Sequence, residues 1–374
     1  MEGTKPRTAS SLGMFDLLKG VGMLLIVFAH TSELYPVGDV STITPMTFFL
    51  FAYREALMAA FYIASGYGFR KRSIGKCISQ QCKTLLKPYL YTALATTLGH
   101  LVIHYKTFGS WNNAVYETYK VAGGFVLGLP HTATYFGQEF FSCGPMWYLL
   151  ALMLGWIFLD VILNIFPEQY IHWAVLGTML LGWGISLVWE APFCIAQGMV
   201  IVPYLYVGFW AKKQKLFDKR LKPLALAGLL GAAVVIGISV VVTGKTDCVS
   251  LGEWVLGPFS ILLDTVAGLG FILLFMKVQR LLDNPITHLI EAVGRRSLYI
   301  FCIHTVELTA IPWYLVAQHY AAAPLRGLWV QFGVSLASIF VLCELLLRRR
   351  DVMLKLFPNR RKRLAGHQRY VAKH

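Results

Sequence analysis

Ten apolar stretches, each long enough or nearly long enough to cross a bilayer as a helix, divide this sequence into short polar connections. About 20 apolar residues in a helix cross the hydrocarbon core, and a helix satisfies its own backbone hydrogen bonds there. The chain is therefore expected to be an all-α, polytopic membrane protein with about ten transmembrane helices. The stretches lie at about 14–32, 46–69, 84–104, 145–165, 170–189, 193–211, 222–243, 254–276, 297–317 and 327–347.

The placement of lysine and arginine orients these spans. Cytoplasmic connections carry an excess of both residues, and most of the 34 lie in alternate connections if the N-terminus is cytoplasmic. We therefore expect cytoplasmic termini, with a short segment at 1–13, a ten-helix domain at 14–347 and a basic tail at 348–374. The first apolar run lacks a following cleavage site and is expected to be a retained span. The outer segment 105–144 is expected to fold partly back over or into the outer leaflet.

Charge and cysteine content exclude several other classes of protein. The net charge of +15 follows from the topology, and the basic tail is suited to anionic lipid. Membrane lipid is therefore an expected partner, and nucleic acid is not. The seven cysteines are scattered without a CxxC pair, which predicts neither a zinc site nor a disulfide framework. No metal is expected.

The first span carries two ionisable residues, Lys19 and His30. Such groups are costly inside a bilayer. The helix between them places the two side chains roughly 16 Å apart and on nearly the same face. Either Lys19 reaches the headgroups while a neighbouring helix satisfies His30, or both side chains face one cavity.

The second span carries Arg54 and Glu55 at the depth expected for His30. One interpretation is a local ion pair at the interface. The other is that Glu55 orients or polarises His30 in an outward-facing pocket, as carboxylates do for working imidazoles.

Basic residues gather where the second span ends and the third begins, at the membrane face nearest Lys19. The positive-inside bias alone explains many such patches. Together with Lys19, the patch is also suited to a phosphate-rich ligand such as a nucleotide or coenzyme A. Its members are Arg70, Lys71, Arg72, Lys83 and Lys87.

Two further segments contain candidate binding residues. Trp147 opens the fourth span beside Tyr148, where it either belongs to an aromatic belt or stacks on a substrate. His304 and Glu307 in the ninth span are three residues apart and face the same way. At that depth they are expected to face protein or water rather than lipid.

The order of these motifs resembles the acyltransferase-3 family of integral-membrane O-acyltransferases over nearly the whole chain. The resemblance departs from the family pattern in having Lys19 where arginine is more common, and Lys83 and Lys87, at a different spacing, in place of the paired loop arginines. Some members also carry a fused extracytoplasmic esterase-like domain, which is not expected here. The matching segments are Phe15-Asp16 with Lys19 and His30, Phe61 to Tyr67, Lys83 to Tyr89, Met146 to Leu149, and Tyr299 to His304.

The resemblance implies an enzyme of the plasma membrane, an O-acetyltransferase within the acyltransferases that transfer groups other than amino-acyl groups. Such proteins move an acyl group, usually acetyl, from cytoplasmic acyl-CoA as co-substrate to a hydroxyl of a sugar, lipid-linked sugar or cell-envelope glycan on the other face. His30 would be the general base or a transient acyl carrier, and Glu55 would orient it. The coenzyme would be bound by Lys19, Arg70, Arg72, Lys83 and Lys87. Trp147 would bind the acceptor, and His304 and Glu307 would either bind the acceptor or support the site without touching it.

Two other classes compete with this interpretation. A secondary transporter or flippase would use the intramembrane histidines and glutamates as a proton relay, and it would be expected to show an inverted repeat with broken helices in both halves. The sequence shows no such repeat. A membrane scaffold or sensor would leave Lys19 and His30 on one face without explanation.

Overall fold

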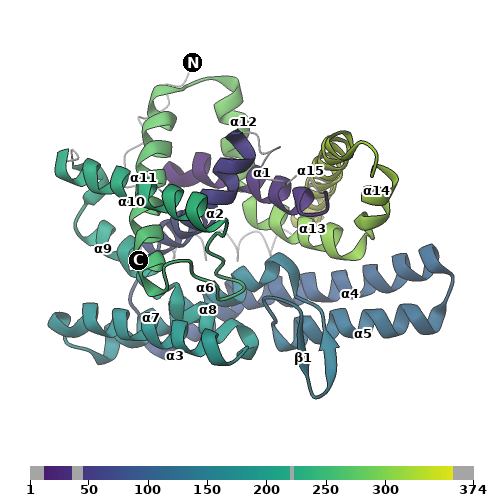
Figure 1. Ribbon diagram of the computed structural model, residues 1–374, viewed down its shortest axis with the longest axis horizontal. Helices are drawn as coiled ribbons and strands as arrows, with labels where there is room; N and C mark the ends of the chain where they lie inside the picture. The colour runs from purple at the N-terminus through teal and green to yellow at the C-terminus, as the bar shows by residue number, and fades with distance from the viewer. Residues whose placement is uncertain (1–11, 36–44, 220–222, 357–374) are drawn as a thin grey trace.

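Helices form nearly all of the regular structure in residues 12–35, 45–219 and 223–356, which the computed structural model describes (Figure 1). The expected all-α fold is confirmed. The helices are α1 (Asp16–Ser32), α2 (Pro45–Tyr67), α3 (Ile74–Gln81), α4 (Lys87–Phe108), α5 (Trp111–Leu127), α6 (Trp147–Ile165), α7 (Ile171–Val188), α8 (Ile195–Val200), α9 (Val202–Lys213), α10 (Pro223–Thr243), α11 (Pro258–Leu281), α12 (Pro285–Arg295), α13 (Ser297–Ala310), α14 (Trp313–His319) and α15 (Pro324–Leu356). The strands β1 (Ala133–Tyr135) and β2 (Gln138–Phe140) form one antiparallel hairpin with Ala133 opposite Phe140.

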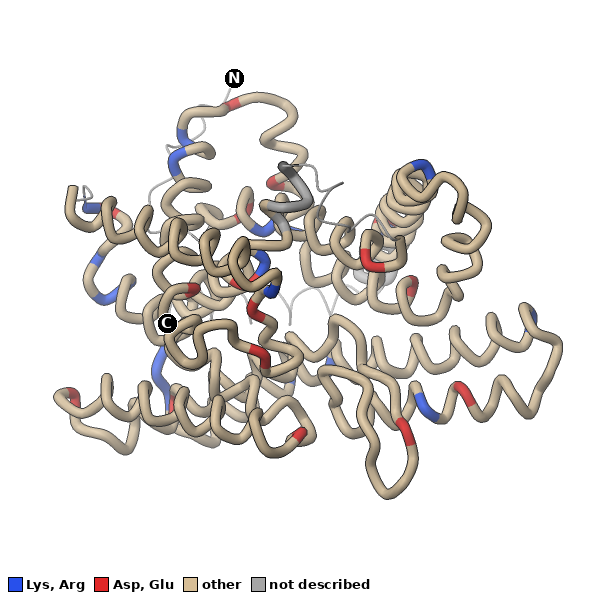
Figure 2. Tube along the Cα trace, in the orientation of Figure 1, with Lys and Arg blue, Asp and Glu red and all other residues tan. Residues whose placement is uncertain are grey.

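The helices account for the apolar stretches of the sequence. Six described helices are long and apolar enough to cross a bilayer, and two bent pairs, α8–α9 and α13–α14, raise the number to eight. The two remaining stretches form α2, of 23 residues, and α4, of 22 residues. Both have spanning length but contain more polar residues, among them Arg54 and Glu55 in α2. Figure 2 shows how sparse charged residues are along the other long helices.

The last helix, α15, extends past the expected end of the membrane domain at residue 347. Helix α15 continues to Leu356, so the first part of the expected tail at 348–374 is helical. Residues 1–11 and 357–374 lie outside the described residues. The cytoplasmic position of both termini stays a prediction.

The outer segment 105–144 contains a helix that the sequence did not define. Gly109, with φ of 72°, ends α4 in the left-handed conformation, which glycine adopts without steric cost. Ser110 then caps α5, and its side chain accepts a hydrogen bond from the Asn113 backbone N–H at 3.3 Å. Helix α5 returns along α4 (Figure 1), and the β hairpin and a loop lead on to α6.

Helix α1 is held by a close crossing with α12. A Cβ atom at Gly20 would overlap the backbone carbonyl of Ile290, and one at Gly294 would overlap the backbone carbonyl of Asp16. Small residues at a crossing allow two backbones to approach closely inside a membrane. Helices α2 and α9 cross in the same way at Gly66 and Gly208. These contacts fix the two helices that carry His30 and Glu55.

Two helices are broken rather than continuous. The axis bends by 48° between α8 and α9 and by 66° between α13 and α14, where Pro312 precedes α14. Proline lacks the N–H needed to continue a helix. Both breaks lie in the C-terminal half of the chain. They therefore differ from the pattern of one break in each half that a transporter with an inverted repeat would show.

Candidate active site

His30 and His304 lie next to each other on two helices that are far apart in the sequence. His30 lies in the last turn of α1 and His304 lies on α13, and their ring centroids are 5.7 Å apart. The His30 side chain is 29% exposed, whereas that of His304 is 1% exposed. One imidazole is therefore open to a ligand and the other is enclosed by protein.

Three hydrogen bonds centred on Glu307 hold the enclosed histidine, His304, on the Nδ1 side of its ring. His304 Nδ1 lies 3.2 Å from Glu307 Oε2, and the Ser335 hydroxyl on α15 donates to Glu307 Oε1 at 2.6 Å. Trp313 Nε1 donates to the Glu307 backbone carbonyl at 3.2 Å. A carboxylate at Nδ1 favours the tautomer in which Nε2 is the acceptor. His304 Nε2 is buried and has no hydrogen-bond partner among the described residues.

The open histidine has its own carboxylate. His30 Nδ1 lies 3.4 Å from Oε2 of Glu33, which follows the end of α1. Burial favours the neutral form of Glu33, but the hydrogen bond from His30 and the charges of His30 and Arg54 outweigh this effect. The pKa of Glu33 therefore lies below its ordinary value of 4.5.

Both histidines occur in the same short sequence pattern, which the sequence reasoning recognised only once. His30 to Glu33 reads His-Thr-Ser-Glu, and His304 to Glu307 reads His-Thr-Val-Glu. Each threonine donates its hydroxyl to a carbonyl one turn back, Thr31 to Val27 and Thr305 to Phe301. The spacing that singled out His304 and Glu307 also identifies Glu33, which was missed.

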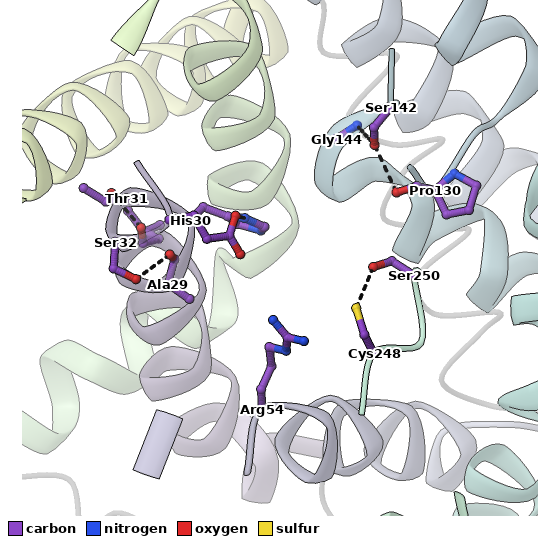
Figure 3. A network of polar contacts seen from close by, with 12 residues as sticks. Ala29, His30, Thr31, Ser32, Arg54, Pro130, Ser142, Gly144, Cys248 and Ser250 are labelled. Atoms are coloured by element: carbon purple, nitrogen blue, oxygen red, sulfur yellow. Dashed lines mark hydrogen bonds and ion pairs between the residues drawn. The ribbon is translucent and has the colours of Figure 1, made fainter. Parts of the chain in front are cut away.

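Arg54 and Glu55 on α2 form an ion pair beside this site. Arg54 Nε lies 3.3 Å from Glu55 Oε1, and Arg54 Nη2 donates to the Asp247 backbone carbonyl at 3.2 Å. In Figure 3 the Arg54 side chain points from α2 into the space between His30 and the loop of Cys248 and Ser250. The structure thus pairs Glu55 with Arg54 and gives His30 a different carboxylate, Glu33. The geometry favours the interpretation of Arg54 and Glu55 as a local ion pair, and a catalytic role for Glu55 stays a prediction.

A cavity of about 230 Å³ runs beside α1 on the side of Lys19. Its lining includes Lys19, Met23 and Ile26 of α1, which follow one another at helical spacing towards His30. Ser65 and Tyr148 supply polar atoms, while most of the other lining residues are apolar. Lys19 and His30 therefore lie on the same stretch of one helix face, with a cavity along it.

Tyr148 lines this cavity, whereas Trp147, which the sequence suggested for binding, does not. The Tyr148 ring stacks on Tyr62 at a centroid distance of 4.6 Å. Trp147 is half-buried and packs against the core. The motif therefore includes a cavity-lining residue of α6, and substrate contact by Trp147 stays a prediction.

The other cationic residues that we expected to bind the coenzyme are not among the residues that line the described cavity, although Leu85, between Lys83 and Lys87, is. Arg70, Lys83 and Lys87 are exposed, and Lys87 Nζ lies 5.7 Å from the centroid of the Tyr91 ring. The backbone N–H of Arg72 donates to Asp160 Oδ1 at 2.9 Å, which fixes the loop after α2 against α6. The structure does not bring these four residues together with Lys19 in the cavity wall.

Comparison with known proteins identifies the family. The family model Acyl_transf_3, described as an acyltransferase domain, matches residues 13–348, nearly the whole chain. The chain belongs to the acyltransferase-3 family. The resemblance seen in the motifs is confirmed, and the protein is a membrane acyltransferase. No curated protein and no solved structure gives a significant match.

In this acyltransferase-3 protein, Glu33 engages Nδ1 of the open imidazole, and the catalytic role of His30 stays a prediction. His304 lies against His30 with a buried, unpartnered Nε2. Among the described residues, no group of three or more His, Cys, Asp or Glu side chains is arranged to hold a metal ion.

Proposed function

We propose that this protein is an O-acyltransferase of the plasma membrane that moves an acyl group, with acetyl as the first choice, from cytoplasmic acyl-CoA to a hydroxyl of a sugar or cell-envelope glycan on the opposite face. The observation that carries the proposal is the cavity that runs along α1 from Lys19 towards His30. An apolar passage beginning at a cation suits a thioester arm that ends in phosphates. The acyltransferase family supports the reaction class.

Lys19 would hold the phosphate end of the coenzyme near the mouth of the cavity. A lysine offers one compact charge rather than a bidentate clamp, so the exposed Arg70, Arg72, Lys83 and Lys87 would add attraction over the same membrane face. The acyl end of the donor would then lie deeper along α1, near Ile26 and His30. His30 would meet the acyl carbon there.

The chemistry can proceed by two routes that use the same atoms of His30. In one route, Nε2 takes the proton of the acceptor hydroxyl while its oxygen attacks the thioester carbon, the carbon–sulfur bond breaks, and the proton passes to the coenzyme thiolate. In the other, Nε2 itself attacks the thioester carbon, the carbon–sulfur bond breaks, and the coenzyme leaves as its thiolate. The acceptor oxygen then attacks the acyl-imidazole, the carbon–nitrogen bond breaks, and the hydroxyl proton passes to the coenzyme thiolate. Glu33 at Nδ1 stabilises the cationic imidazole that forms in both routes.

The proposal is tested with membranes that contain the wild type, His30→Ala or His288→Ala at matched protein levels. His288 is an exposed histidine of α12 that pairs with Asp283 and serves as the control. The membranes receive labelled acetyl-CoA and a crude glycan or lipid-linked sugar fraction, and base-labile label on the glycan is counted. We expect transfer by the wild type and by His288→Ala, and a loss of about 10²- to 10⁴-fold in His30→Ala. Equal transfer by all three proteins would remove His30 from the reaction.

A further inference from the structure

A second and larger cavity, of about 470 Å³, is lined in part by residues that directly follow the two histidine motifs in the chain. Its walls come from α4, α5, α13 and α14, with single residues from the loops that follow α1 and β2. The break between α13 and α14 shapes one wall, since Ile311 and Pro312 at the break both line the cavity. The volume falls within the range of about 300 to 1,000 Å³ that is usual for ligand pockets.

In each of the two motifs, the residue that follows the glutamate lines this cavity. Leu34 follows Glu33, Leu308 follows Glu307, and both leucines line the cavity. Trp313 also lines it and donates its indole N–H to the Glu307 carbonyl. The cavity is therefore lined by the immediate chain neighbours of the two glutamates that contact His30 and His304.

The polar groups of the cavity are neutral or already paired. His100 Nδ1 on α4 is 2.8 Å from the Thr118 hydroxyl. Glu117 on α5 accepts a hydrogen bond from Lys120 Nζ at 3.1 Å. Asn113 adds an uncharged amide, and His104 Nδ1 is buried without a hydrogen-bond partner among the described residues. The cavity therefore offers hydrogen bonds without an unpaired cation in its described lining.

The remaining lining is rich in aromatic rings. The His104 ring lies against Phe108 at a centroid distance of 4.5 Å, and Phe141, Trp313 and Tyr314 line the cavity with them. Aromatic faces next to scattered neutral hydrogen-bonding groups suit a sugar ring, which has apolar C–H faces and hydroxyls at its edge. An anionic ligand would be desolvated next to Glu117 without a free counter-charge.

We propose that this cavity is the acceptor subsite and that it takes an uncharged hexose unit, with the side chains of His104 and Asn113 as hydrogen-bonding partners for its hydroxyls. The place of the subsite in the reaction rests on the proposed function, because one hydroxyl of the bound ring must reach His30. The choice of a neutral sugar over an acidic one rests on the cavity itself.

A binding measurement tests the subsite without any transfer assay. The purified full-length protein in detergent is treated with diethylpyrocarbonate, and carbethoxylation of His104 and His288 is measured by peptide mass spectrometry. The probes are the methyl glycosides of glucose, galactose, mannose and N-acetylglucosamine, together with methyl glucuronide. We expect at least one neutral glycoside to lower His104 modification several-fold in a saturable way, with His288 unchanged and glucuronide without effect. Protection by none of the neutral glycosides, or equal protection by glucuronide, would overturn the proposal.

A kinetic measurement separates failure of the subsite from failure of the proposed function. We expect His104→Ala and Asn113→Ala to raise the KM for the glycan acceptor at least several-fold, with the KM for acetyl-CoA unchanged. His319→Ala, an exposed α14 residue outside the described cavity lining, is the control and should leave both values unchanged. If transfer occurs and the two cavity variants leave the acceptor KM unchanged, the subsite is wrong and the function stands. If glycosides protect His104 but no protein transfers label, the subsite stands and the function is wrong.

Discussion

The rings of His30 and His304 lie 5.7 Å apart although they come from opposite ends of the chain. Each is followed three residues later by a glutamate that contacts its Nδ1. Helical spacing alone brings a residue and its third neighbour together. The same local histidine–glutamate arrangement therefore occurs twice in the structure. The two copies differ in exposure, which suits His30 to react and His304 to hold its position.

Glu33→Gln should weaken acyl transfer without weakening donor binding. The amide can still contact His30 but carries no charge to stabilise the imidazole when it becomes cationic. We expect kcat to fall by about tenfold or more, within the range known for acid–base catalysis, with an unchanged KM for acetyl-CoA. Steady-state kinetics on matched membranes measure both. Glu168→Gln, at an exposed residue before α7, is the control, and an unchanged kcat in Glu33→Gln would contradict the role given to Glu33.

Ser335→Ala should be more harmful than Ser338→Ala on the same helix. The Ser335 hydroxyl donates to the buried Glu307 carboxylate, whereas that of Ser338 donates to a backbone carbonyl of its own helix. A buried acceptor that loses its donor costs about 1–3 kcal/mol. We expect a lower Tm and slower transfer in Ser335→Ala only, measured by thermal unfolding in detergent and by the transfer assay. Equal effects of the two substitutions would show that the Glu307 contact is unimportant.

Met58→Trp should block the donor cavity. Met58 lines the cavity beside α1, and an indole there would occupy space that the acyl arm needs. We expect weaker binding of acetyl-CoA and slower transfer, measured as KM and kcat. Leu94→Trp is the matched control because Leu94 is 59% exposed on α4. Wild-type kinetics in Met58→Trp would place the donor elsewhere.

Gly20→Ala should destabilise the protein, whereas Gly177→Ala should not. The new methyl group at Gly20 meets the backbone carbonyl of Ile290, and nothing lies within 4 Å of the corresponding position at Gly177. Overpacking typically costs about 1–3 kcal/mol, while alanine improves an open helix position by up to about 1 kcal/mol. Thermal unfolding in detergent, followed by size-exclusion chromatography, compares the two. A Tm for Gly20→Ala at or above that of Gly177→Ala would contradict the close crossing of α1 and α12.

The thermal stability of the protein should depend on pH through the buried carboxyl group of Asp247. Burial raises the pKa of this loop carboxyl above its ordinary value of 3.8, although Oδ1 accepts a hydrogen bond from the Val255 N–H at 2.6 Å. A raised pKa means that the folded state holds the proton more tightly, so the stability from this group is present at low pH and is lost as pH rises through the raised value. Asp247→Asn retains an acceptor for Val255 and cannot ionise. Its Tm should therefore fall less than that of the wild type as pH rises from about 4 to 7.

Asp247→Ala serves as the comparison for that experiment. It removes both the charge and the acceptor, and it leaves the Val255 N–H without the 2.6 Å partner. We expect a lower Tm at every pH, because a buried donor without a partner is costly. Parallel pH profiles for the wild type and Asp247→Asn would show that this carboxyl does not contribute to the pH dependence.

The sequence was sufficient for the helical membrane fold and for the family. Long apolar stretches and the alternation of basic residues do not depend on tertiary contacts, and Lys19 and His30 share a face because the helix repeat requires it. The partners of the charged side chains could not be inferred in this way. The expected depth in the membrane suggested that Glu55 contacts His30, but in the structure Glu55 forms an ion pair with Arg54. Helix α5 was not defined either, since its exposed and buried residues alternate without a long apolar run.

The close crossing of α1 with α12 also determines how the protein responds to its bilayer. Helix α12 has 11 residues, too few to span, and it exposes Ile286 and Leu289, as an interfacial helix does. Because Gly20 and Gly294 lock α1 to it, we expect the depth of His30 to be set by the leaflet in which α12 lies rather than by the mid-plane. A thicker or thinner bilayer would then shift the far surface relative to His30. Hydrophobic mismatch would act mainly on access from that far side.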